Sequence, residues 1–246
     1  MLSIVIPTLN EAENLKQLIP QLYFSLKDQE VEVIIVDGHS TDSSRNIVSE
    51  YSKEYPRLRF ILQSGKGFAN ALTEGMMNAS GRVIVTMDAE NHKASEIPLL
   101  LEKLSQGFDV VVGSRFLKGS KVDLTPERFF STRIANKIAQ AALELKIKDT
   151  SSGFRAYDAE TLKKVVRKGI KTEYFSCQVE LLEKIKENGG NLGEVPVHYI
   201  RRDKGESKYN LTPALKDASI LVEIARDRNI KKFQKMVGDA SNKKKK

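Results

Sequence analysis

The sequence has little cysteine and no long apolar run, and both absences restrict what the protein can be. Its single cysteine, Cys177, excludes an intramolecular disulfide framework and a zinc cluster built on cysteines. No apolar stretch approaches the roughly 20 residues that span a bilayer, and the N-terminus carries no signal-peptide pattern. No internal repeat and no linker rich in Pro, Gly or Ser divides the chain. We therefore expect an intracellular globular protein.

The excess of positive charge is confined to one end of the chain. The chain has 40 Lys and Arg residues and 32 Asp and Glu residues. Residues 201–246 contain 14 of the basic and 6 of the acidic residues, which leaves 26 basic and 26 acidic residues in the rest of the chain. A localised basic segment is typical of binding to an anionic surface, and phospholipid headgroups fit as well as nucleic acid does. Because the terminal lysines have no interleaved aromatic residues, we expect no nucleic-acid partner. A solvated tail that aids solubility is the alternative.

The first half of the chain alternates strand and helix patterns in a regular way. Runs rich in Val and Ile predict strands, and apolar residues at helical spacing predict helices. The predicted strands are 2–6, 31–36, 58–62, 82–87 and 110–112, and the predicted helices are 11–26, 41–55, 66–78 and 96–104. This alternation predicts an α/β fold with a mostly parallel central sheet flanked by helices on both faces. In such sheets ligands bind beyond the carboxyl ends of the strands.

The second half is less regular. The pattern predicts helices over 126–145, 159–167, 178–188 and 211–226, a strand over 193–200, and a polar turn over 149–155. The last of these helices has an apolar stripe on one face. That stripe either packs on the core or lies on a membrane surface.

Two acidic residues follow the fourth predicted strand. Asp88 and Glu90 stand one residue apart, so their side chains point the same way at a spacing of about 6–7 Å. Such a pair suits a hard divalent cation that also takes oxygens from a diphosphate. The alternative is that the two carboxylates merely end the strand.

Other polar segments fall at the same edge of the predicted sheet. Asp37 ends the second strand and could accept hydrogen bonds from a base or a ribose, while Ser40 or Thr41 could cap the next helix. The Gly65-Lys66-Gly67 segment opens the third helix, where free N–H groups and the lysine could face a phosphate. Loop and cap chemistry is the alternative for each segment taken alone. Together they favour a nucleoside diphosphate site.

The motifs, taken in order and with their spacing, resemble a known family. The segments Ile4-Val5-Ile6-Pro7-Thr8-Leu9-Asn10-Glu11, Val36-Asp37-x-x-Ser40-Thr41-Asp42, Gly65-Lys66-Gly67 and Met87-Asp88-Ala89-Glu90 are similar to those of family 2 inverting glycosyltransferases of the GT-A fold. Later segments narrow the resemblance to the dolichyl-phosphate mannose synthase group. They are Gly113-Ser114-Arg115, Thr132-Arg133-x-Ala135-Asn136, Asp149-x-x-Ser152-Gly153-Phe154-Arg155-Ala156-Tyr157, Glu194-Val195-Pro196 and Arg202-x-x-Gly205-Glu206-Ser207-Lys208. The resemblance covers residues 2–208.

The resemblance implies a role for each matching residue. The residues expected to bind the donor nucleotide are Pro7, Leu9, Glu11 and Asp37. Those expected to bind Mg²⁺ or Mn²⁺ and the diphosphate are Asp88, Glu90 and His92, with Ala89 between the carboxylates and Lys66 near the phosphates. The acceptor phosphate is expected to bind Arg115, Arg128, Thr132 and Arg133, and Arg202 and Lys208 are expected to close over the phosphates. Asp88, Arg115, Arg128 and Arg133 are the expected catalytic residues.

Three positions depart from the family pattern. Gly38 stands where relatives have a second carboxylate after Asp37, and Glu90 stands where they have an aspartate. His92 stands where they have a glutamine ligand, and its softer nitrogen shifts the expected metal preference from Mg²⁺ toward Mn²⁺. The hydrophobic C-terminal helices that some relatives carry are not found in this sequence.

The implied activity is the transfer of one sugar, with inversion, from a nucleotide diphosphate donor to dolichyl or polyprenyl phosphate. GDP-mannose is the favoured donor, a UDP-sugar is the alternative, and a sugar-nucleotide-binding subunit without turnover is a third reading. A phosphate monoester is already anionic near neutral pH, so it attacks without a strong general base. We expect a catalytic domain over 1–210 and a helical, basic extension over 211–246. The expected location is the cytoplasmic face of a membrane, reached through an anionic surface or a membrane partner subunit.

Overall fold

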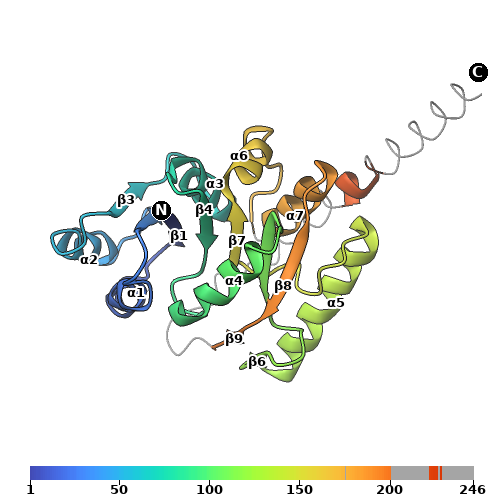
Figure 1. The fold of residues 1–246 in the computed structure, drawn as a ribbon, viewed down its shortest axis with the longest axis horizontal. Coiled ribbons are helices and arrows are strands. Elements are labelled where there is room, and N and C mark those ends of the chain that lie inside the picture. The colour runs from blue at the N-terminus through green and yellow to red at the C-terminus, as the bar shows by residue number, and fades with distance from the viewer. Residues whose placement is uncertain (175, 201–221, 227, 229–246) are drawn as a thin grey trace, which may run out of the picture.

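A computed structural model describes residues 1–174, 176–200, 222–226 and 228 of the chain (Figure 1). Its central sheet has seven strands in the order β3-β2-β1-β4-β7-β5-β8. They are β1 (Leu2–Thr8), β2 (Val31–Asp37), β3 (Leu58–Leu62), β4 (Val83–Thr86), β5 (Val110–Ser114), β7 (Arg155–Asp158) and β8 (Leu192–Pro196). Only β7 runs antiparallel to its neighbours in this sheet, which confirms the predicted α/β fold with a mostly parallel sheet.

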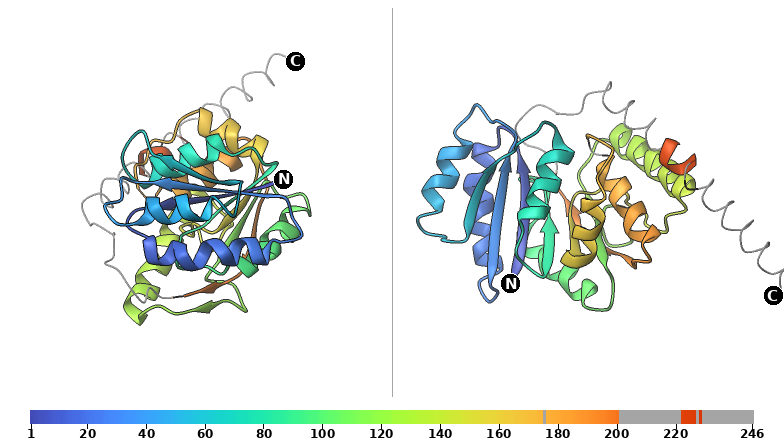
Figure 2. Two further views of the ribbon diagram at one scale, coloured as in Figure 1. Left: turned by 90° about the vertical axis from the view of Figure 1, so that its left-hand side faces the viewer. Right: turned by 90° about the horizontal axis from the view of Figure 1, so that it is seen from above.

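Helices cover both faces of the sheet (Figure 2), and an apolar layer lies on each face. Alternate residues of a strand point to opposite faces, so Ile4 and Ile6 belong to one layer and Val5 to the other. The first layer includes buried residues of α1 (Ala12–Ser25), α2 (Ser44–Tyr51) and α4 (Ile97–Leu104), the last preceded by a short 3-10 turn, η1 (Ala94–Glu96). The second includes residues of α3 (Phe68–Asn78), α6 (Ala159–Arg167) and α7 (Cys177–Glu187). Burial on both faces explains why β1, β2, β4 and β5 are largely apolar along their length.

The segment 149–155 differs from its prediction as a polar turn. Its last residue, Arg155, begins the four-residue strand β7, which inserts antiparallel between β4 and β5. Arg155 is fully buried because its guanidinium donates to the carbonyl oxygens of Thr150, Ser152 and Gln178 at 2.6–2.7 Å. A strand that starts with a buried arginine has no apolar pattern to reveal it.

The end of the described chain also differs in part from prediction. The predicted strand 193–200 divides into β8 and the short β9 (His198–Tyr199), which pairs with β6 (Lys121–Val122) in a second, two-stranded sheet. Most of the predicted helix 211–226 and the lysine tail lie outside the described residues. Where that helix is described, Ile224 and Ala225 are buried in the second apolar layer. None of the helices among the described residues is long and apolar enough to cross a membrane.

Candidate active site

The predicted donor-binding residues gather where three parallel strands end. Thr8 at the end of β1 lies opposite Asp37 at the end of β2, and Val5 of β1 lies opposite Thr86 at the end of β4. Asp88 follows two residues after β4. The sheet therefore brings the first, second and fourth motifs of the sequence to one edge, as the pattern of alternating strands and helices predicts.

The loops after β1 and β2 are joined to each other by hydrogen bonds. The buried Asp37 carboxylate accepts from the backbone N–H of Ser40 at 2.8 Å and from its hydroxyl at 2.5 Å. The same hydroxyl accepts from the N–H of Asn10, whose side-chain oxygen accepts from the N–H of Thr41. Gly38 has little room for a side chain, because a Cβ there would lie 3.2 Å from the Thr8 carbonyl oxygen. Asp37 thus holds the loop that follows β2.

The predicted cap residues of the second helix take other roles. Helix α2 begins at Ser44, and Asp42 accepts from both the N–H and the hydroxyl of Ser44. The other oxygen of Asp42 accepts from the N–H of Ala12, at the start of α1. Asp42 therefore joins the first turns of two helices, whereas Ser40 and Thr41 bond back to the first loop.

Asn14 links two of the predicted site residues. It lies one turn after Glu11 in α1, and its amide donates to Glu11 Oε2 at 2.6 Å. The same amide lies 3.5 Å from Glu90 Oε2, which brings the first motif and the acidic motif together. The sequence reasoning missed Asn14, and its position three residues after Glu11 on the same helix face was the available signal.

His92 faces Asp88 from a buried position. Its Nδ1 lies 4.0 Å from Asp88 Oδ2, and its ring stacks on Phe154 at 4.8 Å and meets the edge of Tyr199 at 5.6 Å. Burial lowers the pKa of His92 to about 4, so the ring is neutral near pH 7. Neither ring nitrogen has a hydrogen-bond partner within the described part of the chain. A neutral imidazole with unpartnered nitrogens beside a carboxylate suits a metal cation.

The three predicted metal ligands do not form a closed cluster. Among the described residues no group of three or more His, Cys, Asp or Glu side chains is arranged to hold a metal ion. Asp88 and His92 face each other, while Glu90 extends toward Asn14. The Asp88 side chain is 28% exposed, which leaves it accessible to a ligand.

Arg115 forms a buried ion pair with Asp149. Its Nε and Nη2 each donate to one oxygen of Asp149 at 2.7 Å, and Nη2 also donates to the Ser151 hydroxyl. Burial alone would raise the pKa of Asp149, but the charge and hydrogen bonds of Arg115 outweigh it and hold the pKa below its ordinary value. The predicted acceptor residue is therefore half of an ion pair that holds the loop after residue 148.

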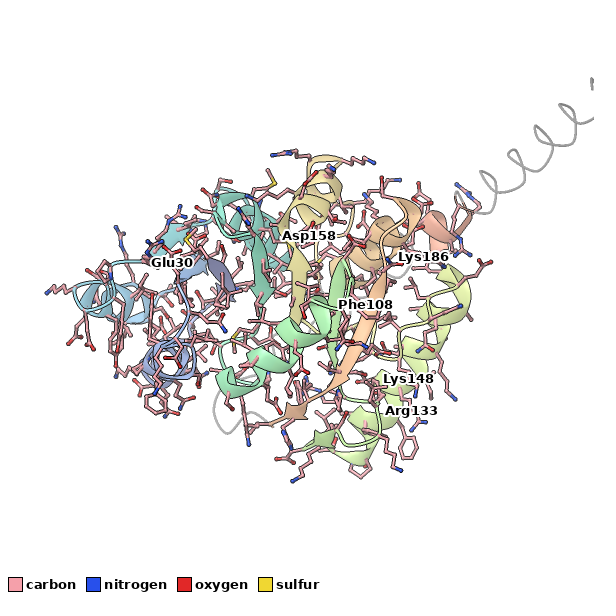
Figure 3. All side chains as sticks on the ribbon, in the orientation of Figure 1. Glu30, Phe108, Arg133, Lys148, Asp158 and Lys186 are labelled. Atoms are coloured by element: carbon pink, nitrogen blue, oxygen red, sulfur yellow. The ribbon has the colours of Figure 1, made fainter. Side chains whose placement is uncertain are left out.

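The other predicted acceptor residues lie on the long helix α5 (Pro126–Leu143). Arg128 is exposed in its first turn, which Thr125 caps, and Arg133 is exposed on the outer side of the helix (Figure 3). Thr132 is half-buried, and its carbonyl oxygen accepts from Asn136. The Asn136 amide also bonds Thr150 and Ser151, so it joins α5 to the loop that holds Asp149.

Tyr199 lies between the two halves of the site. Its ring is 5.3 Å from the Arg115 guanidinium and contacts His92. Burial and the charge of Asp88 raise the pKa of Tyr199, whereas the charges of Arg115 and Arg128 oppose that rise. Tyr199 therefore joins Arg115 to His92, which faces Asp88, and sequence reasoning did not identify it.

The remaining predicted residues add less to the geometry. Lys66 is exposed before α3, where the N–H of Ala69 donates to the Glu173 carbonyl oxygen and is not available to a phosphate. Pro7 is half-buried, Leu9 is 38% exposed, and Ala89 is buried. Arg202 and Lys208 lie outside the described residues.

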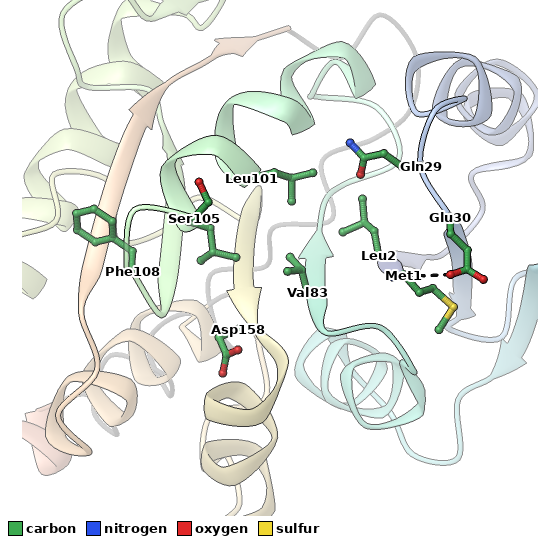
Figure 4. Close-up of a pocket in the computed structure, with 10 residues that line it drawn as sticks. Met1, Leu2, Gln29, Glu30, Val83, Leu101, Ser105, Phe108 and Asp158 are labelled. Atoms are coloured by element: carbon green, nitrogen blue, oxygen red, sulfur yellow. Dashed lines mark ion pairs between the residues drawn. The ribbon is translucent and has the colours of Figure 1, made fainter.

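A cavity of about 540 Å³ lies at the opposite edge of the sheet (Figure 4). Leu2 and Val83 line it from the amino ends of β1 and β4, together with Leu101 and Phe108. Of the predicted site residues that the structure describes, none lines this cavity. The candidate active site is therefore defined by its polar groups and not by this cavity.

Comparisons with known proteins show what the chain is similar to. Residues 3–166 match the family described as Glycosyl transferase family 2. The chain is 34% identical over 210 residues to a dolichol-phosphate mannosyltransferase of Pyrococcus furiosus, covering 84% of this chain but 58% of that protein. It is 29% identical over 212 residues to a polyprenol monophosphomannose synthase of Mycolicibacterium smegmatis, covering 83% of this chain and 79% of the relative.

Solved structures of low sequence identity share the fold. A glucosyl-3-phosphoglycerate synthase of Mycobacterium tuberculosis in complex with UDP superposes with a TM-score of 0.67 at 16% identity, over 92% of this chain and 80% of that one. A complex of the same enzyme with Mn²⁺, UDP and phosphoglyceric acid superposes with a TM-score of 0.64 at 19% identity, over 83% of this chain and 72% of that one. At such identities the likeness establishes a GT-A-like fold alone.

Proposed function

This chain belongs to glycosyl transferase family 2, and from that premise we propose that it moves one sugar from a nucleotide diphosphate to dolichyl or polyprenyl phosphate. GDP-mannose is the favoured donor, and the transfer inverts the configuration at the anomeric carbon of the mannose. The observation that supports this most is that His92, which faces Asp88, and Arg115 both contact Tyr199. A diphosphate would lie beside Asp88 and His92, and Arg128 and Arg133 of α5 are the proposed place of the second phosphate.

On the donor side, Asp88 and His92 are the residues that would hold a divalent cation, while Glu90 faces Asn14. The neutral, unpartnered imidazole fits that role, and Mn²⁺ and Mg²⁺ complexes of the M. tuberculosis neighbour support it. A bound cation would neutralise the charge of the leaving diphosphate. The loops built by Asp37 and Asn10 orient the nucleoside at the ends of β1 and β2.

On the acceptor side, the arginines align and neutralise a nucleophile that needs no strong base. An oxygen of the lipid phosphate attacks the anomeric carbon, the bond from that carbon to the diphosphate oxygen breaks, and the nucleoside diphosphate leaves with the electron pair. Arg128 and Arg133 supply positive charge from α5 to the phosphate. Arg115, already paired with Asp149, holds the neighbouring loop in place and adds little net charge.

A transfer assay tests the proposal against its rivals. Radiolabelled GDP-mannose and UDP-glucose are incubated with the protein and Mg²⁺ or Mn²⁺, with and without a short polyprenyl phosphate. Label that enters the lipid from GDP-mannose supports the proposal. Label from UDP-glucose alone supports the second candidate, which the UDP complexes of the structural neighbours favour. Tight donor binding without any transfer supports a binding subunit.

We expect the variants Arg128→Ala and Arg133→Ala to raise the KM for the lipid phosphate about tenfold to a hundredfold. Loss of a charge-assisted hydrogen bond to phosphate costs about 1.5–3 kcal/mol. The affinity for the nucleotide donor, measured by calorimetry, should stay nearly unchanged. Arg167→Ala, an exposed arginine at the end of α6, is the matched control. If donor binding collapses instead, the two arginines serve the diphosphate and the division of the site is wrong.

The exposed face of α5 is the proposed contact with the membrane that carries the acceptor. Phe130, Ile134 and Ile138 follow one another at intervals of four residues and are 62%, 58% and 64% exposed. Arg133 and Lys137 lie beside them on the helix. An apolar stripe flanked by cations is complementary to an anionic bilayer surface. The terminal lysines, which are also expected to bind an anionic surface, lie outside the described part of the chain.

We expect the double variant Ile134→Gln/Ile138→Gln to bind anionic vesicles at least tenfold more weakly. Burial of an isoleucine side chain contributes about 1.5–3 kcal/mol, and partial insertion recovers a fraction of that for each residue. Phe24→Gln, at a residue that is 78% exposed on α1, is the control and should bind like the wild type. Turnover of a short, water-soluble acceptor should not change. Equal cosedimentation of the double variant and the wild type would remove α5 from the membrane contact.

A further inference from the structure

Gln178 is a buried amide that lacks a partner. It lies in the first turn of α7, is 0% exposed, and neither its Nε2 nor its Oε1 forms a hydrogen bond to any described residue. Its position is nevertheless fixed, because its backbone carbonyl oxygen accepts from Arg155 Nη1 at 2.6 Å. Burial of an unpaired amide destabilises a fold, so a group outside the protein is the natural partner.

The Gln178 amide points toward the acidic motif. A Cβ placed on Gly153 would lie 3.5 Å from Gln178 Nε2 and 3.4 Å from Asp88 Oδ1, so both atoms border the same small space. Gly153 is held there by Thr86, whose hydroxyl donates to the Gly153 carbonyl oxygen at 2.7 Å. The other oxygen of Asp88 faces His92. The Asp88 carboxylate thus borders both the candidate cation site and the space beside Gly153, where its Oδ2 would also lie 3.8 Å from a Cβ on Gly153.

The Asp88 carboxylate and the Gln178 amide restrict the kind of ligand that can bind in this space. A carboxylate accepts hydrogen bonds and repels an anion, which argues against a phosphate in this space. A neutral amide both donates and accepts, and an apolar ligand would leave it unsatisfied. A hydroxyl group donates to the carboxylate and exchanges a hydrogen bond with the amide. We infer that Gln178 and Asp88 bind hydroxyl groups of the transferred sugar, and that Gln178 is a specificity-determining residue for that sugar.

This inference rests on the proposed function, and it can be tested without an acceptor. Gln178→Leu keeps a similar volume and removes the amide, while Gly153→Ala fills the space with a methyl group at ordinary contact distances. We expect both variants to bind GDP-mannose, or UDP-glucose if that is the donor, at least tenfold more weakly. Binding of GDP or UDP alone should stay unchanged in calorimetry. Gln106→Leu, an exposed glutamine before β5 at the far edge of the sheet, is the matched control.

Two further measurements separate a sugar contact from a structural role. The melting temperature of Gln178→Leu should equal or exceed that of the wild type, because an unsatisfied buried amide is removed. Donors that lack single sugar hydroxyls should bind the wild type much more weakly, and the variant should lose that discrimination. Unchanged affinity of both variants for the sugar nucleotide overturns the inference, and so does an equal loss for the nucleoside diphosphate. If these binding results hold but no sugar reaches polyprenyl phosphate, the proposed acceptor fails and the sugar contact stands.

Discussion

The Asp88→Ala variant is expected to lose sugar transfer and the metal-dependent part of donor binding. Asp88 follows β4 at the edge where β1 and β2 also end, and it lies 4.0 Å from the neutral ring of His92. A cation that joins the protein to the diphosphate would lose its principal carboxylate. Removal of transition-state charge stabilisation of this kind costs several kcal/mol, which lowers the rate by a factor on the order of 10³ or more.

Calorimetry of the donor with and without Mn²⁺ measures the effect on binding. In the wild type, addition of EDTA should weaken donor binding, whereas in the variant EDTA should change nothing. The Asp88 side chain is partly exposed, so we expect only a small change in melting temperature. Asp28→Ala, at an exposed residue between α1 and β2, is the control. Donor affinity that remains equally sensitive to EDTA would exclude Asp88 as the metal ligand.

The parts of the fold that sequence reasoning predicts well are those with a strong local pattern. The predicted strand 31–36 differs from β2 by one residue, because a largely apolar run marks a strand that is buried on both faces. The acidic motif and Asp37 were found for a related reason. Polar residues directly after such runs have to lie at one edge of a parallel sheet.

The parts that were missed depend on partners distant in the sequence. β7 is stable in the sheet because three backbone carbonyl oxygens accept hydrogen bonds from the Arg155 guanidinium. The local sequence gives no indication of these hydrogen bonds. Gln178 and Tyr199 are single polar residues whose neighbours within the chain carry no signal of their role. Arg115 matches the expected motif, but only the fold reveals its pairing with Asp149, 34 residues away.

Among the substitutions proposed for this protein, removal of the Asp149 charge is expected to lower the free energy of unfolding the most. The Asp149 side chain is 0% exposed, and Asn cannot compensate the charge of Arg115, whose side chain is 10% exposed. Loss of one partner from a buried ion pair costs about 3–5 kcal/mol, since the remaining charge stays buried and unpaired. Urea unfolding of Asp149→Asn at pH 7 should therefore give a free energy of unfolding lower by that amount.

The pH dependence of this loss follows from the lowered pKa of Asp149. A carboxyl group whose pKa is lower in the folded than in the unfolded protein stabilises the fold above its unfolded pKa of about 3.9. That stabilisation is lost as the pH falls through the folded value. The difference between the wild type and Asp149→Asn should be constant at neutral pH and shrink below about pH 4. A difference below about 1 kcal/mol at pH 7, or one that persists unchanged in acid, would contradict the ion-pair account.

A double variant separates the stability of the pair from its function. In Arg115→Met/Asp149→Leu both charges are replaced by apolar side chains, and replacement of a whole buried pair is often neutral or stabilising. We therefore expect this variant to regain most of the stability that Asp149→Asn loses. It should still transfer sugar poorly, because the loop with Ser151 and the α5 helix joined to it by Asn136 would no longer be held beside Tyr199. If full activity returned with stability, the ion pair would serve the fold alone and the acceptor phosphate would depend on Arg128 and Arg133.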